Sequence, residues 1–375
     1  MPHIALYRAV KDGDLEEVER LLLEEKNIDV NVTDTYLNTP LYYAVANGYI
    51  GIVKLLLSHG ANINSINCSG NTPLICSVIA EQVEIVKLLL SHGADVHYKN
   101  YHRLAALHYA SVRDTKITDT LLAYGADINL SGGLNTTALH IAAEQGHEQN
   151  VDYLLACGAD INSLDYFGDT PLTASVSAHH QNEAIIKSLV AYTVKLESYN
   201  IHISSEGFIK NKACIDESPA LTEIKQKCLQ EIQEMKSFKI VSNLSFFEVF
   251  IQKRNINILA RCANNPYIAE HQCKFPIYYS FIEKSIEEGK ARAKLLQGAA
   301  ESIDEIFESN QDDSQEIQKS WLHLSPEVRV MILENLSNND LTKLQHTDVA
   351  EAGEAGAEVE AEAEVGGAYA IYEGE

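Results

Sequence analysis

The sequence predicts an all-α protein. A solenoid of about six helix-turn-helix repeats with hairpin loops is followed by a smaller helical domain and a disordered acidic tail. Three observations predict this fold class. One pattern recurs with a period near 33 residues as far as about residue 199. Beyond it the period is lost, but apolar residues keep helical spacing. The last segment, residues 347–375, carries nine acidic residues and no Lys or Arg.

The repeating pattern opens with Thr-Pro-Leu or a variant and closes with Gly-Ala. The closing glycines Gly60, Gly93, Gly125 and Gly158 are spaced 33, 32 and 33 residues apart. The copies are ALYRAVKDGDLEEVERLLLEEKNIDVN (5–31), TPLYYAVANGYIGIVKLLLSHGANIN (39–64), TPLICSVIAEQVEIVKLLLSHGADVH (72–97), AALHYASVRDTKITDTLLAYGADIN (105–129), TALHIAAEQGHEQNVDYLLACGADIN (137–162) and TPLTASVSAHHQNEAIIKSLVAY (170–192). Recurrence at a fixed spacing is much harder to obtain by chance than a single motif.

Each copy carries the start and stop signals of two helices. Thr39, Thr72 and Thr170 can cap the first helix with their hydroxyls. The proline after each stands at the first helical position, where a missing N–H costs nothing. The second helix has an apolar stripe and stops at a glycine suited to a left-handed cap. Alanines at a fixed position keep the first helix thin, so that neighbours can approach: Ala44, Ala110, Ala142 and Ala174.

This pattern resembles ankyrin repeats over residues 4–199, since a period of 33 with T-P-L-H-x-A is their signature. The resemblance implies stacked helix pairs that bind a protein partner through hairpin tips and first helices. It also implies a structural role, in hydrogen bonds between repeats, for His108 and His140. No nucleophile or carboxylate recurs at a fixed offset from these histidines.

The predicted hairpin tips supply the candidate target-binding residues. Three of the five tips carry aromatic side chains, which are typical binding anchors when exposed. The alternative is that these rings fold back onto the neighbouring loop. The candidate residues are Tyr36, Ser69, Tyr101, His102, Leu134, Tyr166 and Phe167.

The period ends near residue 200. Residues 200–218 are predicted as a linker, because SEGFIKNKACIDESPA (205–220) is polar and broken. Residues 219–317 are predicted as a helical region with helices over 219–238, 244–268 and 274–308.

Residues 318–346 contain a short amphipathic segment, HLSPEVRVMILENLSNNDLTKL (323–344). Its Pro-Glu start suits the first turn of a helix, and Val328, Ile332 and Leu336 share one face. The segment resembles an F-box, which implies binding to a Skp-type adaptor as a helix in a groove. The implied adaptor-binding residues are Leu324, Pro326, Glu327, Val328, Ile332, Leu333, Leu336, Asp340 and Leu341.

Two departures from the F-box pattern stand out. Ser325 replaces the family's usual first proline, and the motif gives way to the acidic tail earlier than an ordinary F-box would end. In the alternative interpretation the same stripe packs on the chain's own preceding helices.

The order of the regions is similar to that of the ankyrin/PRANC proteins of poxviruses and of ankyrin effectors of Rickettsiales such as Orientia and Wolbachia. The segments LSFFEVFIQKRNINILARCANNPYI and KFPIYYSFIEKSI resemble the helical part of PRANC. The resemblance implies a secreted, host-directed adaptor that binds a host protein and recruits a Skp-cullin-F-box ubiquitin ligase in the host cell cytoplasm or nucleus. The alternative is an ankyrin protein outside the ubiquitin system that sequesters a host factor.

Composition narrows the remaining function classes. The formal net charge of −24 disfavours nucleic acid and anionic membrane surfaces as partners. No apolar run reaches the roughly 18 residues that a membrane span needs. The start lacks a secretory signal peptide, so the tail of residues 347–375 is the candidate secretion signal. An excess of Lys over Arg, 21 to 8, is compatible with the AT-rich genome of an intracellular bacterium.

No motif indicates an enzyme, a cofactor or a metal. The seven cysteines show no paired spacing, which suggests a reducing compartment. Cys262, His271 and Cys273 fit no zinc-finger spacing and lack an evident fourth ligand. A hidden enzyme within residues 200–317 would need a pocket with convergent polar groups.

Overall fold

A computed structural model describes residues 2–24, 28–178, 181–199, 204–237, 239–241, 244–245, 247, 260, 268, 272–309, 333, 338 and 341. The chain divides into two compact units, residues 1–231 and 232–375. Buried apolar residues occur in both, so each unit has a core of its own.

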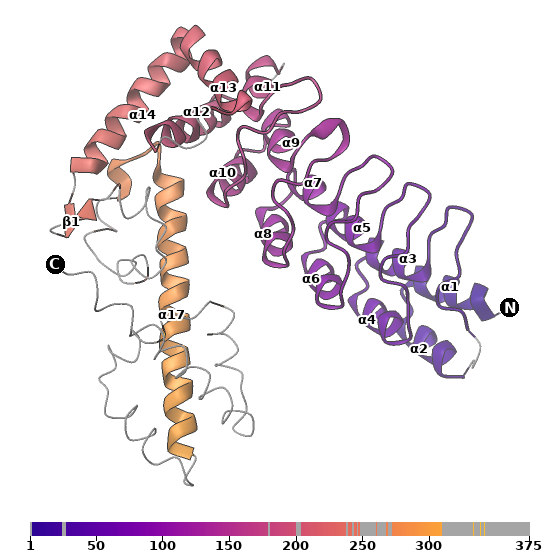
Figure 1. Ribbon diagram of the computed structural model, residues 1–375. Helices are drawn as coiled ribbons and strands as arrows, with labels where there is room; N and C mark the ends of the chain where they lie inside the picture. The colour runs from indigo at the N-terminus through magenta and orange to yellow at the C-terminus, as the bar shows by residue number, and fades with distance from the viewer. Residues whose placement is uncertain are drawn as a thin grey trace. The chain divides into compact units, whose positions relative to one another are not determined.

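The first unit is a stack of six helix pairs, which confirms the predicted fold class. Figure 1 shows the first helices side by side in one row and the second helices in another. The pairs are α1 (Pro2–Asp12) with α2 (Leu15–Glu24), α3 (Pro40–Ala46) with α4 (Ile50–Ser58), α5 (Pro73–Ile79) with α6 (Val83–Ser91), α7 (Ala106–Ala110) with α8 (Thr115–Ala123), α9 (Ala138–Glu144) with α10 (Glu148–Ala156), and α11 (Pro171–Ser177) with α12 (Glu183–Ser198).

The first helices begin where the sequence predicts. The hydroxyl of Thr39 accepts a hydrogen bond from the Tyr42 N–H at 3.3 Å, and Thr72 and Thr170 cap α5 and α11 in the same way. Ala105 stands at this position before α7 and has no hydroxyl. There the Nδ1 of His108 accepts a hydrogen bond from the Ala105 N–H at 3.1 Å and secures the start of the helix.

The core of the stack is a set of apolar side chains at equivalent positions of successive repeats. Each first helix contributes one fully buried leucine, and burying such a side chain stabilises the fold by about 1.5–3 kcal/mol. These leucines are Leu6, Leu41, Leu74, Leu107, Leu139 and Leu172. The thin-helix alanines Ala44, Ala110 and Ala142 are fully buried as well, whereas Ala174 is half-buried.

A hydrogen bond at the end of each of the first four repeats ties it to the next. In three junctions an asparagine side chain accepts the bond from a backbone N–H about 31 residues further on: Asn31 from Asn62, Asn64 from Asp95 and Asn129 from Asp160. At the third repeat His97 takes this place, and its Nε2 accepts from the Asp127 N–H at 3.1 Å. Polar contacts between repeats therefore stabilise the stack in addition to its apolar core.

Part of the predicted linker is instead a helix of the stack. Residues 206–217 form α13 (Glu206–Glu217), which contacts α11 and α12 and buries Phe208 and Ile215. The Ser205 hydroxyl caps it by accepting from the Phe208 N–H at 3.2 Å. The buried Asn211 amide donates to the Ile161 carbonyl at 3.2 Å, and its oxygen accepts from the Thr170 hydroxyl at 2.5 Å. The polar surface that suggests a linker is the outer face of this helix.

Helix α14 (Pro219–Ser237) follows, as predicted, and spans the boundary between the two units. Within α14, the Lys225 ammonium forms an ion pair with Asp216 of α13 at 2.8 Å and lies 3.8 Å from Glu197 of α12.

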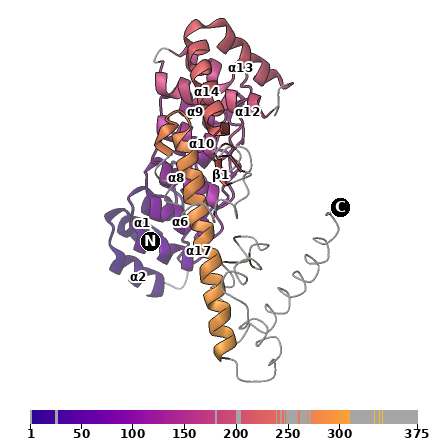
Figure 2. The same cartoon turned by 90° about the vertical axis from the view of Figure 1, so that its left-hand side faces the viewer.

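The second unit contains a small sheet and a long helix. Strands β1 (Lys239–Val241) and β2 (Leu244–Ser245) pair antiparallel, so the helix predicted from residue 244 is wrong at its first two residues. A 3-10 turn, η3 (Gln272–Lys274), precedes the 31-residue helix α17 (Tyr279–Ser309), drawn in orange in Figure 2. Phe275, Tyr278, Ile282 and Leu296 are buried in this unit.

Candidate functional site: a protein-interaction surface

Four of the five hairpins are built around one aspartate or asparagine each. Its side-chain oxygen accepts hydrogen bonds from the backbone N–H groups two and four residues later, at 2.8–3.1 Å, which fixes the loop. These residues are Asp34, Asn67, Asn100 and Asp165. The short polar side chain thus closes the loop from inside and leaves the residues between free to point outward.

The fourth hairpin is built differently. Gly132 stands where the others have the acceptor side chain, and a 3-10 turn, η1 (Gly133–Asn135), forms the tip. Leu134 and Asn135 both adopt left-handed backbone conformations, with φ of 52° and 56°. The Asn135 amide donates to the Leu164 carbonyl at 2.5 Å, which ties this tip to the next hairpin.

Backbone hydrogen bonds join the first three tips of the row to one another and the fourth tip to the fifth. The Cys68 N–H donates to the Tyr36 carbonyl at 2.9 Å, Tyr101 donates to Ser69 at 3.3 Å, and Tyr166 donates to Leu134 at 2.8 Å. A row held in this way presents its side chains from a fixed framework, which lowers the entropy cost of binding a partner.

Most of the predicted tip residues are exposed, although the Tyr101 ring lies against Gly70 of the neighbouring hairpin. The exposed fractions are 63% for Tyr36, 64% for Tyr101, 60% for Leu134, 74% for Tyr166 and 71% for Phe167. His102 is exposed too, and Ser69 is half-buried. The rings of Tyr166 and Phe167 pack edge to face at 5.5 Å. Their role in target binding stays a prediction.

Two tyrosines on the first helices extend the surface inward from the tips. The Tyr43 hydroxyl donates to the Asp34 carboxylate at 2.8 Å, and the Asn100 amide donates to the Tyr109 hydroxyl at 2.8 Å. Each tyrosine lies nine residues after the hairpin side chain that it contacts. The residues predicted from the sequence do not include this pair, although the repeated spacing of nine residues is a signal for it.

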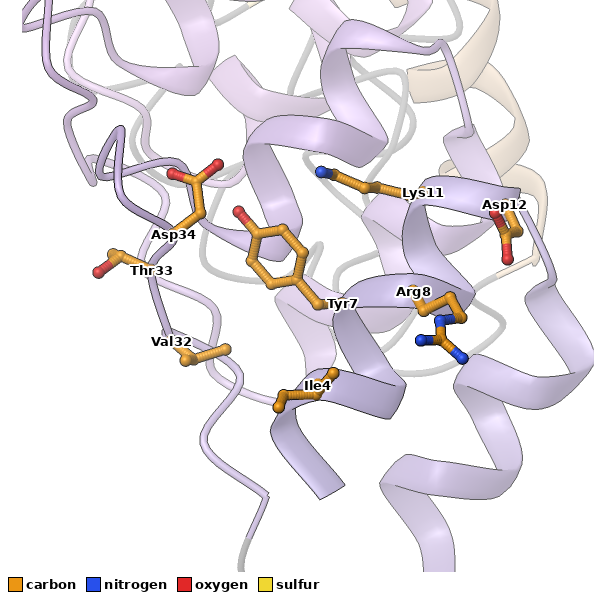
Figure 3. A pocket seen from close by; sticks show the side chains of 8 residues that line it. All are labelled: Ile4, Tyr7, Arg8, Lys11, Asp12, Val32, Thr33 and Asp34. Carbon is orange, nitrogen blue, oxygen red and sulfur yellow. The ribbon is translucent and has the colours of Figure 1, made fainter. Parts of the chain in front are cut away.

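A pocket of about 390 Å³ lies at the N-terminal end of this surface (Figure 3). It is lined by α1 and the first hairpin: Ile4, Tyr7, Arg8, Lys11, Asp12, Val32, Thr33 and Asp34. The Lys11 ammonium lies 4.3 Å from the centre of the Tyr43 ring and 5.3 Å from that of Tyr7. The Tyr7 hydroxyl donates to the Asn38 carbonyl at 2.6 Å.

The charges in this pocket are set by burial and by hydrogen bonds. Burial raises the pKa of the Asp34 carboxyl, but the Asn38 N–H and the Tyr43 hydroxyl lower it by more, so its pKa lies below the usual value. Burial, together with the charge of Asp34, raises the pKa of Tyr7. Asp34 is therefore ionised and Tyr7 neutral at pH 7, and the carboxylate is already engaged by the chain's own donors.

Of the two repeat histidines, His140 makes the predicted hydrogen bond between repeats. The His140 Nδ1 accepts from the Thr137 N–H at 3.2 Å, and its Nε2 lies 3.1 Å from the Asp169 carbonyl of the next repeat. Burial lowers the pKa of both His108 and His140, so both rings are neutral at pH 7. His140 thus bonds to the next repeat as predicted, whereas the bond that the structure gives His108, from the Ala105 N–H, lies within its own repeat and its buried Nε2 has no hydrogen-bond partner among the described residues.

Three residues of the F-box-like segment are described. Leu333 and Leu341 are fully buried, and Asn338 accepts a hydrogen bond from the buried Arg292 guanidinium at 2.8 Å. Leu333 and Leu341 therefore cannot touch an adaptor in this conformation. The other predicted adaptor-binding residues, Leu324, Pro326, Glu327, Val328, Ile332, Leu336 and Asp340, lie outside the described residues.

Among the described residues, no cluster of three His, Cys, Asp or Glu side chains could hold a metal ion. Cys273 is exposed, while Cys262 and His271 lie outside the described part of the chain. None of the helices described is long and apolar enough to cross a membrane.

Comparison with known families and proteins adds to this geometry. The family model "Ankyrin repeats (3 copies)" matches residues 2–67, 60–132 and 107–200, and the model "PRANC domain" matches residues 241–346. Both are interaction modules, and PRANC is F-box-like. The acidic tail lies beyond both matches.

Similar curated proteins come from Fowlpox virus (strain NVSL). Ankyrin repeat protein FPV232 is 30% identical over 202 residues, which are 52% of this chain and 40% of that protein. FPV031 is 29% identical over 48% of this chain and 52% of its own length. FPV222 is 27% identical over 325 residues, 86% of this chain and 38% of that protein. The chain thus spans about half or less of the length of these relatives.

These relatives are viral, and an origin in the Rickettsiales stays a prediction. The matched repeats together run from residue 2 to residue 200, more than half of the 375 residues, and they coincide with the stack of helix pairs and its hairpins. The chain belongs to the ankyrin-repeat family.

Proposed function

We propose that this protein is a substrate receptor for a ubiquitin ligase of a host cell. The ankyrin stack would bind a host protein through its hairpin tips, and the F-box-like region would bind the Skp adaptor of a cullin ligase. One observation carries the proposal: a stack with exposed aromatic tips and a PRANC match over residues 241–346 occur on one chain.

The mechanism is proximity, and it requires no active site on this chain. Holding the target and the ligase together raises the effective concentration of a target lysine near the charged conjugating enzyme. The protein is therefore an adaptor and not an enzyme. It requires two protein surfaces and neither nucleic acid nor a cofactor.

The proposed place of action is the cytoplasm of the host cell, with entry into the nucleus as a further destination. If the protein comes from a bacterium, it must be exported, and the tail of residues 347–375 is the proposed export signal. Deleting this tail should abolish export while leaving the stack folded. Normal export of the shortened chain would refute that role.

Binding to a purified Skp adaptor tests the main proposal. The wild-type chain is compared with Leu324→Ala/Pro326→Ala/Ile332→Ala, and Tyr166→Ala/Phe167→Ala serves as a control at the other surface. We expect the triple variant to lose adaptor binding and the control to keep it, with circular dichroism reporting that both are folded. No binding by the intact chain would rule out the receptor function.

The burial of Leu333 and Leu341 favours a second candidate function. If the F-box-like segment is part of the core of the second unit, the protein acts by sequestering its target and recruits no ligase. The triple variant then loses thermal stability in the second unit, and neither form binds the adaptor.

A further inference from the structure

The middle of the tip row lacks acidic residues in a strongly acidic chain. The hairpins at 65–71, 98–104 and 130–136 contain no Asp or Glu. Acidic residues make up 53 of the 375, so about three would be expected in 21 positions by composition. The depletion covers three consecutive hairpins and therefore a continuous part of the row.

The same part of the row carries positive charge. Lys99 and Arg103 flank Tyr101 in the third hairpin; Arg103 is exposed and Lys99 is half-buried. No carboxylate of the described residues forms an ion pair with Lys99 or Arg103. These cations are thus available to a partner.

The carboxylates that flank this region accept hydrogen bonds from the chain's own donors. Asp34 accepts from the Tyr36 and Asn38 N–H groups and the Tyr43 hydroxyl, while Asp165 accepts from the Phe167 and Asp169 N–H groups. Asp169 accepts from the Thr173 hydroxyl at 3.0 Å. Their oxygens are directed to the chain's own donors, so they compete weakly for the cations of the third hairpin.

An apolar patch follows the basic hairpin along the row. Leu134, Tyr166 and Phe167 are 60–74% exposed and come from two adjacent hairpins that a hydrogen bond between Tyr166 and Leu134 joins. A partner that fits both features offers negative charge to the third hairpin and a large apolar side chain to the fourth and fifth.

We infer that the tip row recognises an acidic segment of its target that also carries a bulky apolar anchor. Carboxylates of this segment pair with Lys99 and Arg103, and the anchor packs on Leu134, Tyr166 and Phe167. This inference rests on the proposed function, since it names the class of target that the receptor holds.

Selection from a random-peptide display library on the full-length chain tests this recognition. We expect the selected peptides to be rich in Asp and Glu and to share a Phe, Leu, Trp or Tyr. Their affinities, measured by fluorescence anisotropy, should fall with added salt. A selection without acidic bias, or one that recovers no binding peptide, would overturn the inference.

Charge-reversal variants locate the site. Lys99→Glu/Arg103→Glu should weaken the selected peptides by about tenfold or more, because like charges then meet across the interface. Tyr166→Ala/Phe167→Ala should weaken them by a similar factor. Lys54→Glu/Lys116→Glu makes the same charge change at exposed positions of the second helices and should leave affinity unchanged. If Lys54→Glu/Lys116→Glu loses as much peptide affinity as Lys99→Glu/Arg103→Glu, only the overall charge of the chain matters. That result would contradict a binding site at the tips.

Adaptor binding separates this inference from the proposed function. Each of these variants should still bind the Skp adaptor if the receptor function is right. A chain that binds the adaptor but shows no acidic preference keeps its proposed function and loses this inference. A chain that binds acidic peptides but no adaptor keeps the recognition site, now as the binding site of a sequestering protein.

Discussion

At the residue scale, the hairpin tips contain backbone strain that sequence changes can relieve. Leu37 and Arg103 have φ of 60°, at the position where the second and fifth hairpins have Gly70 and Gly168. A left-handed conformation costs a residue with a side chain about 1–2 kcal/mol, and glycine avoids most of this cost. Retaining Arg103 in this conformation is consistent with use of its side chain in binding.

We therefore expect Arg103→Gly to raise the free energy of unfolding by about 1 kcal/mol, measured by urea denaturation. Arg103→Ala is the matched control, because it removes the same side chain without relieving the backbone. Equal stabilities of the two variants would contradict strain at this position. The glycine variant should also bind acidic peptides less tightly than the wild type does.

The buried histidines make the stack sensitive to acid. Since burial lowers the pKa of His140 in the folded state, the unfolded chain takes up a proton first as the pH falls. The free energy of unfolding is therefore unaffected by this histidine above the usual histidine pKa of 6.5. Below that pH it decreases, by up to about 1.4 kcal/mol per pH unit for each buried histidine with a lowered pKa.

Urea titrations between pH 7.5 and 5 measure this effect. His140→Gln should be less stable than the wild type at pH 7.5, because the bond to the Asp169 carbonyl is lost, but its stability should fall less steeply with acid. His59→Gln, at an exposed position, should follow the wild-type slope. If the stability of His140→Gln falls with pH as steeply as that of the wild type, groups other than His140 cause the acid sensitivity.

At the scale of elements, α13 closes the C-terminal end of the stack. Gly207 lies so close to the loop between α10 and α11 that a Cβ there would overlap the carbonyl oxygen of Asn162. Gly207→Ala should therefore displace the helix and lower the free energy of unfolding by about 1–3 kcal/mol, measured by urea denaturation. Ile209→Ala, at a 57% exposed position of the same helix, should change stability little. Wild-type stability of Gly207→Ala would mean that α13 does not pack as described.

At the scale of the whole molecule, the two units should fold independently. Repeats contact only their neighbours, and residues 1–231 form one compact unit with its own core. A fragment of residues 1–231 should unfold at the same urea concentration as the stack in the full chain, and it should bind acidic peptides without binding the adaptor. A fragment of residues 1–205, which lacks α13 and α14, should unfold at a lower urea concentration. A poorly folded 1–231 fragment would show that the second unit supports the stack.

The sequence by itself determined the repeat architecture. A thirty-three-residue period reports directly on local structure, because Thr39 caps, Pro40 starts and Gly60 ends helices through contacts within a few residues. It also located the tips, since each tip segment lies between the end of one copy of the pattern and the start of the next. Each of these signals is short-range and repeated, so neighbouring copies reinforce one another.

Only the tertiary structure decided what depends on contacts between distant residues. The helical state of residues 206–217 follows from burying Phe208 and satisfying Asn211 against residues about 40–50 positions earlier, so the segment looks like a linker when considered alone. The burial of Leu333 and Leu341 likewise could not be predicted from the amphipathic spacing of their segment, which suits a binding surface as well as a core. The exposure of Leu134 and Tyr166 accompanies a backbone hydrogen bond between their two loops, and such a bond leaves no periodic trace in the sequence.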